Sequence, residues 1–163
     1  MHDFVGKWIT DKPFFNLKPK NIFHRQYATF ELPKEENLNC HILFRKTFFI
    51  EQKPNRATIY ISADDYYKLY INGRFVGQGP AMSYHSNYNY NVLEVSGFLQ
   101  EGKNVIAVHT LYQGLINRVW QSGDNRHGLL LDLEADGKNI VASDETFFAA
   151  EHEGYETTGT TGY

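Results

Sequence analysis

The chain has 163 residues, a length typical of one domain, and a net charge of −3 at pH 7. Its 15% aromatic residues exclude disorder over most of the chain. The slight acidic excess argues against nucleic-acid partners, and no apolar run approaches the ~20 residues that cross a membrane. The lone Cys40 excludes an intramolecular disulfide. Residues 1–8 lack the basic and apolar parts of a secretion signal, so a cytoplasmic and a periplasmic location both stay open.

Runs of β-branched and aromatic residues predict strands in the first half of the chain. Residues 40–50 (CHILFRKTFFI) and 56–63 (RATIYISA) are partly apolar on both faces, which is typical of strands inside a sandwich. Asn72-Gly73 follows residues 67–71 (YKLYI) and predicts a tight hairpin, because these two residue types tolerate the positive φ that a two-residue turn needs.

The second half repeats this pattern of short strands and turns. Residues 105–111 form a β-branched run that predicts another strand. Residues 128–134 (GLLLDLE) alternate, which directs three leucines inward and Asp132 outward. Asp136-Gly137 predicts a second hairpin turn, with residues 140–148 as its return strand.

No window of helical length shows a 3.6-residue period, so the sequence predicts an all-β fold. Short strands separated by turns favour an antiparallel jelly-roll sandwich, which we expect to occupy residues 1–150 as one domain. Residues 151–163 (EHEGYETTGTTGY) carry no core element, and we expect them to lead into a further strand or domain.

Three segments carry a recognisable pattern: residues 57–80 (ATIYISADDYYKLYINGRFVGQGP), 102–108 (GKNVIAV) and 114–131 (GLINRVWQSGDNRHGLLL). Together with residues 6–9 (GKWI), they resemble the N-terminal β-sandwich domain of bacterial α-L-rhamnosidases, which are glycoside hydrolases of family 78. The first segment also resembles the sugar-binding domains of β-galactosidases. The Asn-Arg-x-Trp and Gly-Asp-Asn-Arg-x-Gly motifs of the third segment are narrower and favour the rhamnosidase family.

The resemblance implies a galactose-binding-domain-like jelly roll that precedes further β-domains and an (α/α) barrel, where acidic residues hydrolyse the rhamnoside with inversion. No part of this chain matches the barrel. The chain is therefore expected to be a non-catalytic accessory domain, with the downstream catalytic domain of the same polypeptide and a rhamnose-containing glycan as its partners. A freestanding lectin-like module and the sugar-binding domain of a β-galactosidase-type enzyme are the alternatives.

The long connection at residues 113–127 supplies four candidate site residues: Arg118, Trp120, Asp124 and Arg126. An arginine can direct two donors onto one carboxylate and so hold a long loop in place, which favours a contact with a neighbouring domain. The other interpretation is a sugar site, in which the tryptophan stacks on the ring and the charged groups bond its hydroxyls.

Two further candidates, Tyr84 and Tyr88, lie in the polar, Asn-rich run of residues 79–91. Spaced tyrosines with amide donors between them can form a stacking platform for a sugar ring. They can equally close one end of a sandwich with their apolar rings. The sequence leaves both interpretations open for these two residues.

No catalytic residue and no metal site is expected. Asp64 and Asp65 are adjacent, but neighbours on a strand point to opposite faces and cannot flank one glycosidic bond. His85, His109 and His127 lie on separate elements without the spacing of metal ligands. The sequence therefore predicts no cofactor, while it leaves open a structural calcium ion held by loop carbonyls.

Overall fold

The structure is a computed structural model that describes residues 1–19, 37–114 and 122–155. These residues contain no α-helix, as the sequence predicts, and no helix among them is long and apolar enough to cross a membrane. In chain order the elements are η1 (Lys12–Phe14), β1 (Cys40–Ile50), β2 (Ala57–Asp64), β3 (Tyr66–Ile71), β4 (Arg74–Gly79), β5 (Asn91–Glu94), η2 (Ser96–Phe98), β6 (Gly102–Tyr112), β7 (Gly128–Ala135), β8 (Lys138–Ala142) and β9 (Phe148–Glu151).

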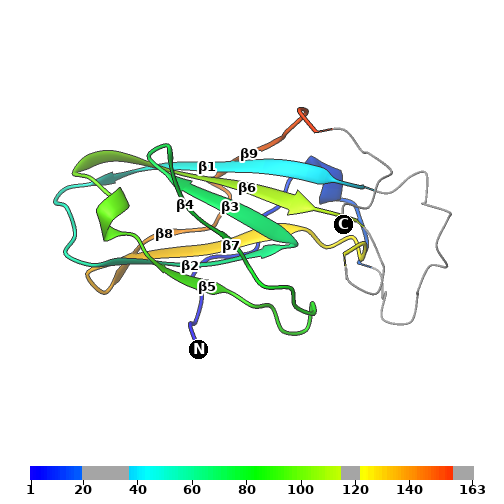
Figure 1. Cartoon of the computed structure of the whole chain (residues 1–163), viewed down its shortest axis with the longest axis horizontal. Coiled ribbons are helices and arrows are strands. Elements are labelled where there is room, and N and C mark those ends of the chain that lie inside the picture. Colours follow the sequence, from blue (N-terminus) through cyan, green and yellow to red (C-terminus); the bar gives the residue numbers. More distant parts are fainter. Residues whose placement is uncertain (20–36, 115–121, 156–163) are drawn as a thin grey trace.

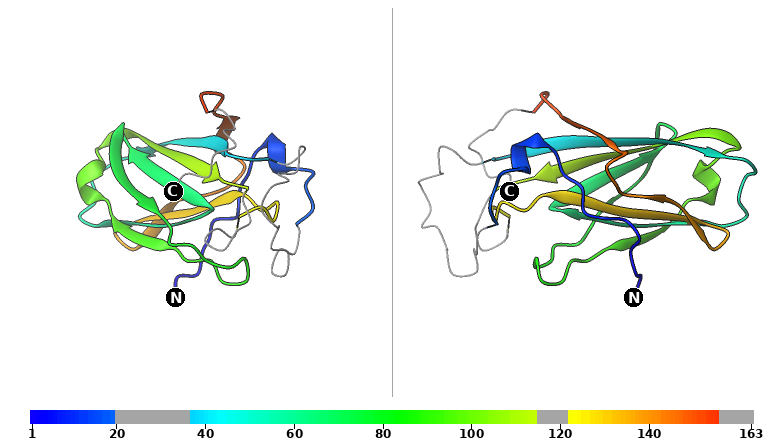
Figure 2. Two further views of the ribbon diagram at one scale, coloured as in Figure 1. Left: turned by 45° about the vertical axis from the view of Figure 1, so that its right-hand side comes forward. Right: turned by 180° about the vertical axis from the view of Figure 1, so that it is seen from behind.

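The strands form two antiparallel sheets that pack face to face (Figure 1). The first sheet has five strands in the order β4-β3-β6-β1-β9, and the second has four in the order β5-β2-β7-β8. Figure 2 shows the same two layers after rotation, with the connections gathered at their two ends. The predicted all-β jelly-roll sandwich is confirmed.

The hydrophobic core lies between the sheets because alternate strand residues point to the same face. Ile59 and Ile61 of β2 are fully buried and pair in register with Leu133 and Leu131 of β7. The five-stranded sheet contributes the facing layer: Ile42, Phe44, Leu69, Ile71, Ile106 and Val108. Complete burial of one such side chain stabilises the fold by about 1.5–3 kcal/mol, so this layer supplies a rigid base for the loops.

Both predicted hairpin turns are present. Asn72 and Gly73 have φ values of 52° and 77°, and they join β3 to β4 with Ile71 opposite Arg74. Asp136 and Gly137 have φ values of 47° and 78° and join β7 to β8. These residue types occupy the left-handed region at low cost, which is why the two turns could be located from the sequence.

The predicted return strand over residues 140–148 is wrong. Strand β8 ends at Ala142, and β9 (Phe148–Glu151) pairs with β1 in the other sheet. The chain turns between these strands because Asp144 Oδ1 accepts a hydrogen bond from Thr146 N at 2.9 Å and Phe147 N donates to Asp144 O at 3.2 Å. Residues 140–148, for which the sequence predicts one strand, thus contribute to two strands in different sheets.

The N-terminal segment covers the outer side of β7. Its Ile9 forms an antiparallel bridge with Leu129, and Asp132 accepts backbone hydrogen bonds from Val5 N and Gly6 N, both at 2.8 Å. Asp132 points away from the core, as predicted, but it is fully buried under this segment. The carboxylate therefore anchors the start of the chain instead of facing solvent.

One end of the sandwich gathers the segments that carry the sequence motifs. Asp64 at the end of β2 is paired with Gly128 at the start of β7. Tyr66 at the start of β3 is paired with Leu111 near the end of β6. The two sheets therefore bring the corner between β2 and β3 close to the connection that leads from β6 to β7.

Candidate functional site

Two carboxyl groups meet at the corner between β2 and β3. The side chains of Asp64 and Asp65 are hydrogen-bonded to each other. The expectation that they point to opposite faces is wrong, because Asp65 lies between the two strands and outside the alternation of either. The pair has no space for a sugar ring between its carboxyl groups.

Each member of this pair has further partners within the chain. Tyr88 Oη donates to Asp64 Oδ2 at 2.6 Å, and Gln113 N donates to Asp65 Oδ2 at 2.7 Å. Burial, and then the neighbouring charge of Asp65, raises the pKa of Asp64 well above its usual range, and burial also raises that of Asp65. Two carboxylates in contact and out of water cannot both ionise easily, so the pair retains a proton at neutral pH.

Asp124 and Arg126 stand beside this pair and bond each other. Asp124 is 5% exposed, and its Oδ1 accepts from Arg126 N at 2.9 Å while its Oδ2 accepts from Arg126 Nη1 at 2.6 Å. The charge of Asp124 adds to the rise in the pKa of Asp64, which places it near the pair. We call these four residues together with Tyr88 the acidic cluster. A charge-assisted contact of this kind favours one local conformation of residues 124–126, just before β7.

The six predicted site residues lie in different parts of the chain. Asp124, Arg126 and Tyr88 belong to the acidic cluster, and the Tyr88 ring packs on Trp8 with ring centroids 4.8 Å apart. Tyr84 is 50% exposed in the loop between β4 and β5. Arg118 and Trp120 lie outside the described residues.

Sequence reasoning missed Asp64 and Asp65 as members of this cluster. It also missed Ser122, whose hydroxyl accepts a hydrogen bond from Gly114 N at 2.7 Å and bonds Asp65. The one available signal was that Asp64-Asp65 ends a strand, as loop-facing polar residues commonly do. The prediction extended the alternation of side chains along β2 to Asp65, which lies one residue beyond that strand.

The histidines that the sequence raised as metal ligands lie apart in the fold. His85 is exposed, and His109 bonds His41 on the five-stranded sheet. His127 lies between the hydroxyls of Thr10 and Thr110, at 3.0 and 2.8 Å, and burial lowers its pKa to about 3. His127 is therefore hydrogen-bonded through both ring nitrogens and neutral at pH 7.

The acidic cluster does not fit a calcium ion. Its carboxylate oxygens are bonded to each other, to Tyr88, to backbone N–H groups and to Arg126, whereas calcium needs six to eight free oxygen ligands. Within residues 1–19, 37–114 and 122–155, no group of three or more His, Cys, Asp or Glu side chains is arranged to hold a metal. A structural calcium ion elsewhere, and the absence of any cofactor, stay predictions.

The fold places this chain among antiparallel jelly-roll β-sandwich domains. Residues 52–160 match the family described as the alpha-L-rhamnosidase N-terminal domain. The chain therefore belongs to the family of α-L-rhamnosidase N-terminal domains. This match decides in favour of the rhamnosidase resemblance over the β-galactosidase-type alternative.

Solved structures of rhamnosidases agree with the family match. The GH78 family rhamnosidase of Bacillus sp. GL1 superposes with a TM-score of 0.73 and 26% identity, over 93% of this chain and 14% of that enzyme. The α-L-rhamnosidase from Dictyoglumus thermophilum gives a TM-score of 0.58 and 28% identity, over 68% and 13%. The enzyme from Aspergillus terreus gives 0.57 and 26%, over 76% and 16%. No curated protein sequence matches this chain.

The chain spans only about 14% of the length of the Bacillus enzyme that it matches. In all three enzymes, the matched region is one small part of a longer chain.

Proposed function

We propose that this chain is a non-catalytic accessory domain of an α-L-rhamnosidase-like glycoside hydrolase, which supports the downstream catalytic domain and contacts a rhamnose-containing glycan. One observation carries the proposal. Nearly the whole chain, 93%, superposes on only 14% of a GH78 rhamnosidase. The remaining length of such an enzyme is available for catalysis, and this chain supplies a sheet-built support.

The arrangement of carboxyl groups supports a non-catalytic role. Hydrolysis of a glycoside uses two carboxyl groups about 5–9.5 Å apart on opposite sides of the sugar. Asp64 and Asp65 instead contact each other, and Asp124 is occupied by Arg126. These acidic side chains bond groups of the same chain and leave no gap for a substrate between them.

The end of the sandwich that holds the acidic cluster is the proposed contact surface. Tyr84 is exposed there, and the Asp124–Arg126 pair fixes the neighbouring residues 124–126. Docking of the next domain and contact with glycan are both compatible with this surface. The predicted domain boundary after residue 150 falls inside β9, so the proposed link to the next domain, within residues 151–163, begins beyond Glu151.

Two assays on the chain test the two parts of this proposal. Incubation with an aryl α-L-rhamnoside is expected to release no aryl alcohol above the buffer rate, and turnover would contradict the non-catalytic role. Calorimetry with methyl rhamnosides and galactosides is expected to give saturable binding. A flat titration would remove the glycan contact and leave only the supporting role.

Matched variants locate the contact. Tyr84→Ala and Arg126→Ala are expected to weaken rhamnoside binding about tenfold, since each removes a group from the acidic end. Phe75→Ala is the control, because Phe75 is equally exposed, 52% against 50%, but lies beside the Asn72-Gly73 hairpin at the opposite end. Equal losses in all three variants would contradict a local site.

The coding sequence after Tyr163 separates this proposal from its alternatives. Further β-domains and a helical barrel are expected there. An immunoglobulin-like domain followed by a TIM barrel would support a β-galactosidase-type enzyme. A stop codon at that point, together with sugar binding, would support a freestanding lectin-like module.

A further inference from the structure

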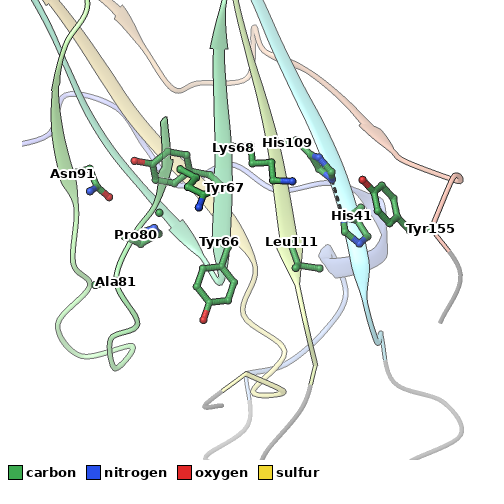
Figure 3. A pocket seen from close by; sticks show the side chains of 12 residues that line it. His41, Tyr66, Tyr67, Lys68, Pro80, Ala81, Asn91, His109, Leu111 and Tyr155 are labelled. Atoms are coloured by element: carbon green, nitrogen blue, oxygen red, sulfur yellow. Dashed lines mark hydrogen bonds between the residues drawn. The ribbon is translucent and has the colours of Figure 1, made fainter. Parts of the chain in front are cut away.

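A cavity of about 480 Å³ lies over the five-stranded sheet, apart from the residues of the acidic cluster (Figure 3). Outward-facing side chains of β3, β6 and β1 form its floor, among them Lys68, His109 and His41. It extends to the residues that follow β4 and to the start of β5, where Asn91 lies. Its size falls within the about 300–1,000 Å³ that is usual for small-molecule sites.

Two of the residues that line this cavity, Tyr67 and Asn91, each hold a buried polar atom that lacks a partner among the described residues. Tyr67 is 2% exposed, and neither its Oη nor Asn91 Oδ1 has a hydrogen-bond partner among the described residues. Buried polar atoms are almost always bonded in native proteins, so two of them lining one cavity indicate an absent partner. Burial raises the pKa of Tyr67, and the phenol is therefore a neutral donor.

The two atoms lie on either side of a glycine. A Cβ at Gly79 would stand 2.5 Å from Asn91 Oδ1 and 3.4 Å from Tyr67 Oη. Both atoms therefore lie close to Gly79 at the end of β4, where the absence of a side chain lets them approach the backbone. A ligand hydroxyl can accept from the Tyr67 phenol and donate to the Asn91 carbonyl at once, whereas a carboxylate cannot donate and an ammonium cannot accept.

The other side of the cavity is polar, aromatic and nearly uncharged. His41 Nδ1 and His109 Nε2 are 2.8 Å apart, and the Tyr155 ring stacks on His41 with a centroid distance of 3.7 Å. Burial lowers the pKa of both histidines, to about 4 for His41, so both are neutral at pH 7. The residues that line the cavity include no carboxylate, and Lys68 is exposed and repels cations. A neutral ligand fits these groups best.

We propose that this cavity binds one neutral monosaccharide ring, with a ring hydroxyl bonded between Tyr67 Oη and Asn91 Oδ1. Tyr66 and Tyr155 border the cavity and provide aromatic surface for the C–H face of the sugar. The inference rests on the proposed glycan contact and adds a second site to it, built from other residues than the acidic cluster.

Nuclear magnetic resonance on the whole chain tests the site directly. Titration with methyl α-L-rhamnopyranoside and methyl β-D-galactopyranoside is expected to shift the imidazole C–H signals of His41 and His109 saturably. Cyclohexanol, which offers a ring with a single hydroxyl, is the control and is expected to shift them much less. Histidine signals that stay in place with every sugar would overturn the proposal.

Tyr67→Phe removes only the unpartnered hydroxyl. It is expected to weaken binding about fivefold, the effect of losing one neutral hydrogen bond, without lowering the urea midpoint of unfolding. Tyr70→Phe is the matched control on the same strand, since Tyr70 does not line the cavity, and it is expected to bind normally. Unchanged affinity in Tyr67→Phe would overturn the assignment.

Gly79→Ala places a methyl group 2.5 Å from Asn91 Oδ1, which forces the Asn91 side chain to move, and it is expected to weaken binding more than tenfold. Failure of this site can be told from failure of the proposed function. Suppose that sugar binds, that the Tyr84 and Arg126 variants weaken this binding, and that the His41 and His109 signals do not move. The cavity assignment then fails and the proposed glycan contact stands. If no sugar binds at all, both fail.

Discussion

The acidic cluster and the cavity differ in how their polar atoms are partnered. In the acidic cluster, Asp64, Asp65 and Asp124 are bonded by groups of the same chain. In the cavity, Tyr67 Oη and Asn91 Oδ1 have no partner within the described residues. A polar region whose groups are partnered within the chain offers few atoms to a ligand, whereas a polar region with unpaired buried atoms is prepared for one.

The same comparison indicates that strongly perturbed pKa values do not by themselves identify a binding region. The acidic cluster contains the carboxyl groups with the most perturbed pKa values, and perturbed groups often mark functional sites. Here burial and mutual contact account for the perturbation. The residues that line the cavity include two neutral histidines and one exposed lysine, yet Tyr67 Oη and Asn91 Oδ1 there have no partner among the described residues.

The largest expected effect is at the Asp124–Arg126 contact. Asp124→Ala removes the acceptor of two hydrogen bonds and leaves the partly buried Arg126 guanidinium without this partner, so the free energy of unfolding is expected to fall by about 3 kcal/mol. Urea unfolding measures it. Glu101→Ala, at an exposed turn on the opposite end, is the control and is expected to change stability by less than about 0.5 kcal/mol.

The pH dependence of the acidic cluster gives the second effect. Because the folded pKa of Asp64 lies above its ordinary value of 3.8, the folded chain keeps a proton that the unfolded chain releases. The stability that this group supports is thus present below about pH 4 and is lost as the pH rises. Relative to that of the wild type, the unfolding free energy of Asp64→Asn is expected to rise by about 2 kcal/mol as the pH goes from 5 to 8. A pH-independent difference between the two would contradict the raised pKa.

Two phenol deletions compare the regions directly. Tyr88→Phe removes a hydroxyl that donates to Asp64 at 2.6 Å, so a loss of about 1.5 kcal/mol in unfolding free energy is expected. The control is its double variant with Asp64→Asn. In that background the same deletion is expected to cost about as much at neutral pH, because Asp64 already keeps a proton there and an asparagine oxygen can still accept from the phenol.

The smallest effect is expected for Tyr67→Phe. Its hydroxyl bonds no described residue, so the unfolding free energy is expected to stay within about 0.5 kcal/mol of the wild type or to rise. Thermal unfolding with and without rhamnoside measures it, and only the ligand-induced shift is expected to shrink. A loss as large as that of Tyr88→Phe would remove the distinction between the two regions.

Several elements of this fold could be predicted from the sequence because they depend on neighbouring residues. Asn72-Gly73 and Asp136-Gly137 occupy positive φ for reasons local to each pair. The alternation of residues 128–134 sets the inward direction of its leucines. The rhamnosidase family was likewise accessible from local motifs.

Other features required the tertiary structure, because they depend on groups that are distant along the chain. Asp132 is buried by residues 1–9, and the contact of Asp64 with Asp65 arises at a corner between strands. The cavity joins Tyr67, Asn91 and His109 from three strands. Local sequence determines which backbone angles and which strand faces are favourable, whereas burial and hydrogen-bond partnership are set only when the two sheets pack.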